Sequence, residues 1–219
     1  MNRSLVIVDD VMNNADQFRE AAGSLEFPPA PSSVLYPGRN SRQQIHLEGF
    51  QEQIESVLGE RLVPAGGDSF ARFRLSLEGE DGRGGVHVDP CHWTCVYFLT
   101  ADEFCQGGTD FYRHRSSGLE HAPHTPDQLA KTGAKSYSDY VNNMALPDTN
   151  NPDAWDHVMH VPMRFNRLIL FRPWYFHNAG PGFGTDIGNG RLVYLLFFNS
   201  AAQLEAEQRE TSRAIPATT

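Results

Sequence analysis

Short strand-like segments separated by turn-forming residues run through residues 70–199, and this pattern limits the folds available to the chain. In Phe70–Leu77, apolar residues alternate with Arg72, Arg74 and Ser76, and an alternation with period two is typical of a half-buried β-strand. Further strands are predicted at Gly85–Asp89, Thr94–Leu99, Thr109–His114, Arg167–Phe171 and Arg191–Asn199. Many short strands with Gly-, Asp- and Asn-rich turns between them predict a mostly β protein, a sandwich or a barrel.

Helical sequence flanks these strands, and we expect a single domain over residues 1–219. The 219 residues, 40% of them hydrophobic, are enough for one sizeable core. We place the core at about residues 70–199, an N-terminal helical support at 1–69, an insertion at about 115–161 and a polar tail at 203–219. Expected elements outside the core are a strand at Leu5–Val8 and helices at Asn14–Leu25, Glu48–Glu60 and Asp127–Asn142. A long insertion in a β domain is often a lid or a substrate wall.

Charge and composition exclude several classes of partner. The net charge of −9 argues against a nucleic-acid-binding surface, which would be basic. No apolar segment reaches the roughly 18–20 residues of a membrane span, and no signal peptide is expected. Three cysteines, Cys91, Cys95 and Cys105, are an odd number in a short stretch, which argues against a secreted disulfide framework. We therefore expect a cytoplasmic protein that binds neither nucleic acid nor membrane; nothing in the sequence indicates its oligomeric state.

The segment Gly84–Pro90 carries a candidate metal-binding pair. Side chains alternate faces along a strand, so His87 and Asp89 point the same way while Val86 and Val88 point the other way. An imidazole and a carboxylate side by side supply two ligands of the 2-His-1-carboxylate site that holds non-haem iron. By itself the pair is a weak signal, because a His-x-Asp triplet arises often by chance.

Two later residues strengthen this interpretation. His177 follows the apolar strand Arg167–Phe171 and is placed to complete a metal site from the opposite sheet, although it could also pack among its aromatic neighbours without a metal. Arg191 stands at the head of the most apolar strand of the chain, where a buried cation needs an anionic partner. It is a candidate clamp for a carboxylate, unless it is solvated or paired with Asp186.

Taken in order, these motifs resemble the 2-oxoglutarate/Fe(II)-dependent dioxygenases. The carriers of the resemblance are His87-Val88-Asp89, Tyr97-Phe98-Leu99-Thr100, Gly107-Gly108-Thr109-Asp110-Phe111, His177 and Gly190-Arg191. The Gly-Gly-x-x-Phe hairpin makes the prolyl-hydroxylase-like branch the most similar. The resemblance implies a double-stranded β-helix (a cupin-like jelly roll), with Fe(II) held by His87, Asp89 and His177 and the distal carboxylate of 2-oxoglutarate held by Arg191.

The resemblance also implies the reaction: hydroxylation of a small-molecule, amino-acid or peptide substrate, with release of succinate and CO₂. Relatives that halogenate typically lack the carboxylate ligand, so Asp89 favours hydroxylation. One departure concerns the cosubstrate, because Val193 stands where many relatives have Ser or Thr two residues after the arginine. Candidates for this second contact are Tyr97, Tyr194, Arg72 and Arg74.

Other interpretations remain open. The chain could be a cupin-like metal enzyme that does not use 2-oxoglutarate, or a non-enzymatic jelly-roll binding module. The cysteines could bind zinc together with His92. The pairs His121/His124 and His157/His160 have a three-residue spacing that could chelate a metal on a helix, or they could contact a substrate.

Overall fold

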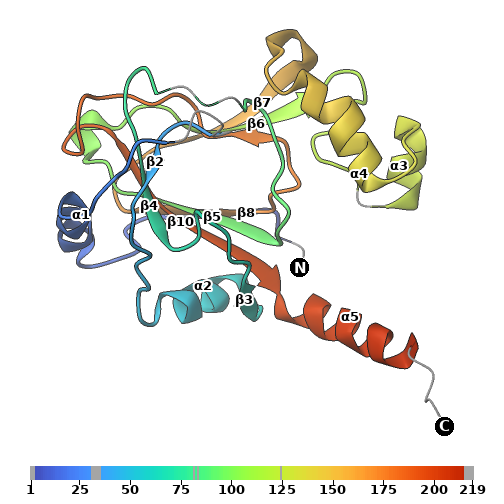
Figure 1. Cartoon of the computed structure of the whole chain (residues 1–219), viewed down its shortest axis with the longest axis horizontal. Helices are drawn as coiled ribbons and strands as arrows, with labels where there is room; N and C mark the ends of the chain where they lie inside the picture. The colour runs from blue at the N-terminus through green and yellow to red at the C-terminus, as the bar shows by residue number, and fades with distance from the viewer. Residues whose placement is uncertain (1–2, 31–35, 81, 83, 124, 215–219) are drawn as a thin grey trace.

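Two antiparallel β-sheets face each other in the computed structural model, which describes residues 3–30, 36–80, 82, 84–123 and 125–214 (Figure 1). The larger sheet contains, in spatial order, Leu5–Val8 (β1), Arg167–Phe171 (β8), Trp93–Phe98 (β5), Arg191–Ser200 (β10), Arg72–Ser76 (β4) and Arg39–Asn40 (β2), with Leu62–Pro64 (β3) beside the end of β10. The smaller sheet contains Trp155–Pro162 (β7), Gly108–His114 (β6) and His177–Asn178 (β9). The described strands thus form the predicted jelly roll of cupin-like type, as two open sheets rather than a closed barrel.

The alternation of side chains along β10 divides the interior into two layers. Tyr194 and Leu196 point to the outer face of the larger sheet, which the helices Ala15–Gly23 (α1) and Phe50–Leu58 (α2) cover. Val193 and Leu195 point to the inner face and pack in a second cluster between the sheets. The helices therefore complete one core layer, and the space between the sheets is left for the site.

Three N-terminal elements, β1, α1 and α2, agree with the sequence expectations in type and place, whereas the strands β2 and β3 were not predicted. β1 pairs with β8 and so forms one edge of the larger sheet. α1 begins directly after Asn14, although the Asn14 side chain makes no capping hydrogen bond. α2 lies between Gly49 and Gly59, both with positive φ. Part of the predicted loop at 27–38 lies outside the described residues.

The insertion between β6 and β7 differs from its prediction in two ways. The single helix expected at Asp127–Asn142 is instead two, Pro126–Thr132 (α3) and Tyr137–Tyr140 (α4), because the chain turns at Gly133 with φ of 75°. A π-helical turn at Val141–Ala145 follows α4. The predicted end of the insertion at residue 161 was also wrong, because β7 already begins at Trp155.

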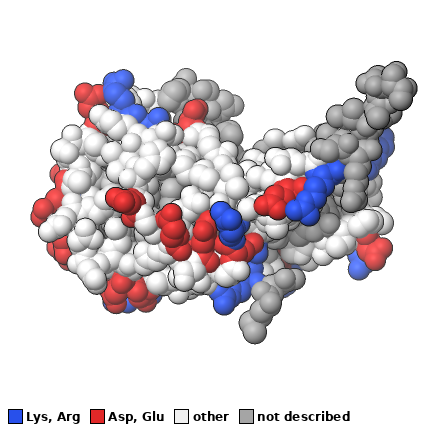
Figure 2. Space-filling view, turned by 90° about the horizontal axis from the view of Figure 1, so that it is seen from below, with Lys and Arg blue, Asp and Glu red and all other residues white. Residues whose placement is uncertain are grey.

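Short 3₁₀ turns complete the connections, at Asp102–Phe104, Leu146–Asp148 and Pro152–Ala154. After β10 the chain continues directly into the helix Ala201–Ala214 (α5), where the sequence predicted only a polar tail (Figure 1). No helix in the described part of the chain is long and apolar enough to cross a membrane. The face drawn in Figure 2 shows scattered acidic side chains and small, separate groups of basic ones.

Candidate active site

The three predicted metal ligands come together between the two sheets. The segment before Asp89 is not the regular strand that was predicted; His87 makes a single antiparallel bridge with His177, each N–H donating to the carbonyl of the other over 3.0 Å. The bridge sets the two imidazole rings 4.3 Å apart, centroid to centroid. Nε2 of His177 lies 3.4 Å from Oδ2 of Asp89, and Nε2 of His87 lies 3.8 Å from Oδ1. All three potential ligand atoms lie within 4.8 Å of one another.

Backbone carbonyls fix which nitrogen of each ring is free. Nδ1 of His87 lies 2.9 Å from the carbonyl oxygen of Gly85, and Nδ1 of His177 lies 2.8 Å from that of Tyr175. A carbonyl oxygen only accepts, so each Nδ1 carries the proton and donates it. Each Nε2 is then left with a lone pair directed toward Asp89, which is the arrangement that metal-binding histidines adopt.

The charge states also suit a divalent cation. Burial, together with the neighbouring His177, lowers the pKa of His87 to about 4, so this ring is neutral at pH 7. Burial alone would raise the pKa of Asp89, but the adjacent imidazoles of His177 and His87 and the hydrogen bond from Thr94 outweigh it and hold the pKa at about 2. Metal binding requires neutral imidazoles and an ionised carboxylate, and for His87 and Asp89 these are the resting states.

The insertion holds the segment that carries His87. The N–H of Val86 donates to the carbonyl of Thr149 over 2.9 Å, and the Thr149 hydroxyl donates to the carbonyl of Val86 over 2.7 Å. A Cβ atom on Gly85 would lie 2.2 Å from the Thr149 carbonyl oxygen, so only glycine fits there. The position of His87 therefore depends on the packing of the insertion as well as on its bridge to His177.

A cavity between the sheets joins the three ligands to Arg191. The Arg191 side chain is buried, with 4% of its surface exposed, and its Nη2 donates to the carbonyls of Gly108 (3.0 Å) and Ala179 (2.8 Å). None of the ion pairs among the described residues includes Arg191; Asp186, the partner considered from the sequence, accepts from the N–H of Gly188 instead. Burial and the nearby Arg74 lower the pKa of Arg191 to about 10. The cavity thus holds a buried guanidinium that forms an ion pair with no carboxylate among the described residues.

A second guanidinium, that of Arg74, lines the same cavity. Its Nε donates to Asn40 over 2.9 Å and its Nη2 donates to Ser69 over 2.7 Å, both neutral partners. Burial lowers the pKa of Arg74 as well. The ring of Tyr36 lies 5.8 Å from this guanidinium and 4.4 Å from the ring of His87, and was missed by sequence reasoning because it sits in a loop without a motif.

The structure does not bring Tyr97 and Tyr194, predicted as cosubstrate contacts, into the cavity. Both point to the outer face of the larger sheet, where the Tyr97 hydroxyl donates to Asn166 and the Tyr194 hydroxyl donates to the carbonyl of Ile45. The alternation along β10 explains this, since Tyr194 stands three residues after the inward-pointing Arg191.

The structure also tests the other metal sites that were considered from the sequence. Among the described residues, the groups of three potential ligands are the triad above and a second group of Asp110, His157 and His160; neither contains a cysteine. The His121/His124 pair cannot be assessed because His124 lies outside the described residues. The His157/His160 pair lies on the strand β7 rather than on a helix.

The fold and the site together define the class: a cupin-like jelly roll with two histidines and one carboxylate converging beside a buried arginine. Within this class the chain belongs to the family described as "Family of unknown function (DUF6445)", which matches residues 84–198, slightly more than half of its length. That match includes all three candidate ligands and Arg191. No curated protein matches the chain.

The solved structures that are similar to this chain have low sequence identity to it. The non-haem α-ketoglutarate-dependent carbocyclase SnoK from nogalamycin biosynthesis aligns with 91% of this chain and 81% of its own, at 15% identity and a TM-score of 0.52. HygX from Streptomyces hygroscopicus, solved with nickel, 2-oxoglutarate and hygromycin B, aligns with 90% of this chain and 83% of its own, at 11% identity and a TM-score of 0.48. At this identity the likeness to SnoK supports the fold, and the prolyl-hydroxylase-like branch stays a prediction.

Proposed function

We propose that the protein is an Fe(II)- and 2-oxoglutarate-dependent oxygenase that hydroxylates its substrate. In this proposal Fe(II) is held by His87, Asp89 and His177, and 2-oxoglutarate is anchored by Arg191. The observation that carries it is the buried Arg191 guanidinium, which faces the same cavity as the triad and has no carboxylate partner among the described residues. SnoK, which shares the fold, is itself α-ketoglutarate-dependent.

A dicarboxylate cosubstrate fits the charges of this cavity. One end of 2-oxoglutarate would chelate the metal, and the other carboxylate would neutralise Arg191, since guanidinium and carboxylate can form two parallel hydrogen bonds. We propose Arg74 as the second contact in place of the Ser or Thr expected near Val193. Arg74 is the Cα partner of Val193 across β4 and β10, and both side chains line the cavity. Ser76 and Thr109 also line the cavity.

The protein's own part in the reaction is to orient the reactants and exclude water. When bound together, Fe(II) and 2-oxoglutarate would activate O₂, which is the oxidant, with succinate and CO₂ as by-products. The apolar side chains of Val96, Phe171 and Leu195 form part of the cavity wall. Asp89, which accepts a hydrogen bond from Thr94 over 3.0 Å, would serve as the carboxylate ligand in place of a halide, and so favours hydroxylation.

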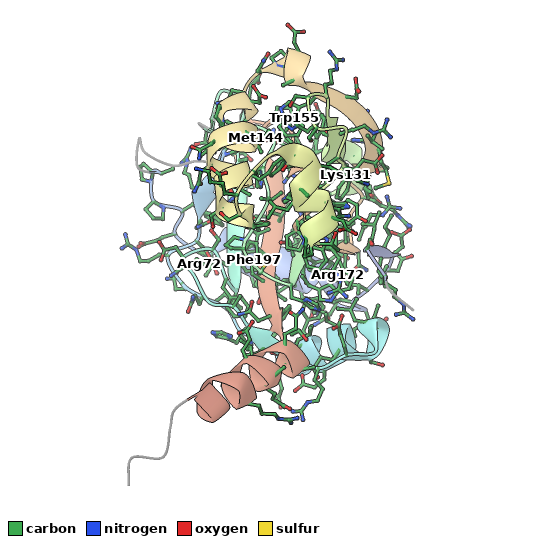
Figure 3. All side chains as sticks on the ribbon, turned by 90° about the vertical axis from the view of Figure 1, so that its right-hand side faces the viewer. Arg72, Lys131, Met144, Trp155, Arg172 and Phe197 are labelled. Carbon is green, nitrogen blue, oxygen red and sulfur yellow. The ribbon has the colours of Figure 1, made fainter. Side chains whose placement is uncertain are left out.

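We propose that the substrate, a small molecule, an amino acid or a peptide, approaches from the far side of Asp89. A second hollow there is lined by Asp89, Cys91, Tyr137, Trp174 and Gln203. Tyr137 belongs to α4, so the insertion forms part of this wall. Figure 3 shows the insertion, in which Lys131 and Met144 are labelled, above the part of β10 that carries Phe197.

We also propose a cytoplasmic location, which the three free cysteines support.

The test is the absorption spectrum of the purified protein under anaerobic conditions. Fe(II) and 2-oxoglutarate together should produce a weak visible metal-to-ligand charge-transfer band that neither gives alone. Absence of the band while iron is measured in the protein would refute the cosubstrate assignment. Asp89→Ala and His177→Ala should abolish iron binding; native protein that binds no iron, nickel or zinc would instead indicate a binding module. Succinate formed during a substrate screen would exclude a metal enzyme that works without 2-oxoglutarate.

A further inference from the structure

A second group of two histidines and one carboxylate lies on the outer side of the smaller sheet. Nε2 of His157 and Nδ1 of His160 both lie 2.8 Å from the same atom, Oδ1 of Asp110. The three potential ligand atoms lie within 4.8 Å of one another. Two imidazoles and a carboxylate are a ligand set that suits Zn²⁺, and three protein ligands are the number found where a fourth position stays open.

A β-bulge makes this arrangement possible. His157 and His160 are three residues apart, and in a regular strand they would point to opposite faces. The register between β6 and β7 shifts between Phe111 and Tyr112, which leaves Val158 as an extra residue in β7. The extra residue reverses the alternation, so that both histidines turn toward Asp110.

The group is separate from the cavity that holds the first triad. Thr109 and Phe111 are 2% and 6% exposed and point inward, whereas Asp110 between them points outward. The exposed fraction of the side chain is 20% for Asp110, 53% for His157 and 39% for His160. An ion can therefore reach all three from solvent. The two groups therefore occupy opposite faces of the smaller sheet.

We propose that Asp110, His157 and His160 bind a zinc ion that ties the edge strand β7 to β6. In the present structure each histidine nitrogen carries a proton and donates a hydrogen bond to the Asp110 oxygen, since a carboxylate only accepts. On binding, each ring carries its proton on the other nitrogen and turns a lone pair to the metal. The open position is available to water or to a donor from another molecule. This inference is independent of the proposed oxygenase function.

The stoichiometry of Zn²⁺ tests it. Wild-type protein dialysed against Zn²⁺ should retain one ion at each of the two groups, counted by elemental analysis. His160→Gln should retain one ion fewer at the concentration that saturates the wild type. His46→Gln is the matched control, because His46 is an exposed histidine far along the chain from both groups, and it should bind as the wild type does.

A thermal measurement isolates the second group. Zn²⁺ should raise the Tm of the variant Asp89→Ala/His177→Ala, which lacks the first group, and adding His160→Gln to this variant should remove the shift. Equal zinc content in His160→Gln and wild type would overturn the proposal, as would a folded Asp89→Ala/His177→Ala variant that binds no zinc. If that variant does not fold, the comparison of His160→Gln with wild type decides the question alone.

Discussion

Replacing Arg191 with Gln should separate the binding of 2-oxoglutarate from the stability of the fold. Burial lowers the pKa of Arg191 from its ordinary value of 12.5 to about 10, so the folded protein disfavours the charged form by about 3 kcal/mol. At pH 7 the group is charged in both folded and unfolded chains, so this cost is present at every pH below about 10. A bound carboxylate would offset it.

Two opposing effects on the unliganded protein follow from this substitution. Arg191→Gln removes the buried charge, but it also removes charged donors from the carbonyls of Gly108 and Ala179, each worth roughly 1.5–3 kcal/mol. The free energy of unfolding should therefore change by no more than about 3 kcal/mol. The affinity for 2-oxoglutarate should fall by about 3 kcal/mol, or roughly a hundredfold, because its distal carboxylate is left buried without a cation.

The assay is an anaerobic titration of the visible band with 2-oxoglutarate, paired with urea unfolding of the unliganded protein. Arg72→Gln is the control, since Arg72 donates to the carbonyls of Ser41 and Arg42 and does not line the cavity. A Kd for Arg191→Gln within threefold of the wild-type value would refute the reasoning. So would a loss of stability well beyond 3 kcal/mol, which would make Arg191 a structural group.

Three further predictions concern the ligand set and its supports. Asp89→Ala should lose bound Fe(II) while its far-ultraviolet circular dichroism stays unchanged; retained iron would contradict the ligand assignment. His114→Ala should lower the free energy of unfolding by about 2–4 kcal/mol and expose residues 115–154 to early proteolysis, because the fully buried His114 ring is hydrogen-bonded to Asp148 over 3.0 Å. A first cleavage outside residues 115–154 would contradict this prediction. Burial alone would raise the pKa of Glu60, but hydrogen bonds from Trp93 and His92 outweigh burial and lower this pKa. The ionised Glu60 therefore stabilises the fold above the ordinary pKa of a glutamate, and this stabilisation is lost as the pH falls. Glu60→Gln should therefore lower the urea midpoint at pH 7 and have less effect as the pH falls below 4.5, the ordinary pKa of the carboxyl group. A pH-independent difference would contradict this explanation.

Most strands could be predicted from the sequence because their alternation and turns are local signals. β10 was expected at Arg191–Asn199 and is found at Arg191–Ser200. β7 was missed because its bulge breaks the alternation and residues 157–160 are all exposed, so neither periodicity nor apolar character marks them. Helix α3 was merged with α4 because a single glycine inside a helical pattern does not by itself indicate a break.

The candidate ligands were found from strand phase and their order along the chain, but the cosubstrate contacts required the register between strands. Arg72, Arg74 and Ser76 were predicted to share a face, and Arg74 and Ser76 do line the cavity. Nothing local, however, says which face of β4 lies on the same side as Arg191, because that depends on the pairing of β4 with β10. The orientation of Tyr194 could have been predicted from the sequence, since a residue three places after Arg191 on one strand must face the other way. The sequence therefore predicts which side chains share a face of one strand. That Arg74 and Arg191 line the same cavity follows only from the pairing of β4 with β10.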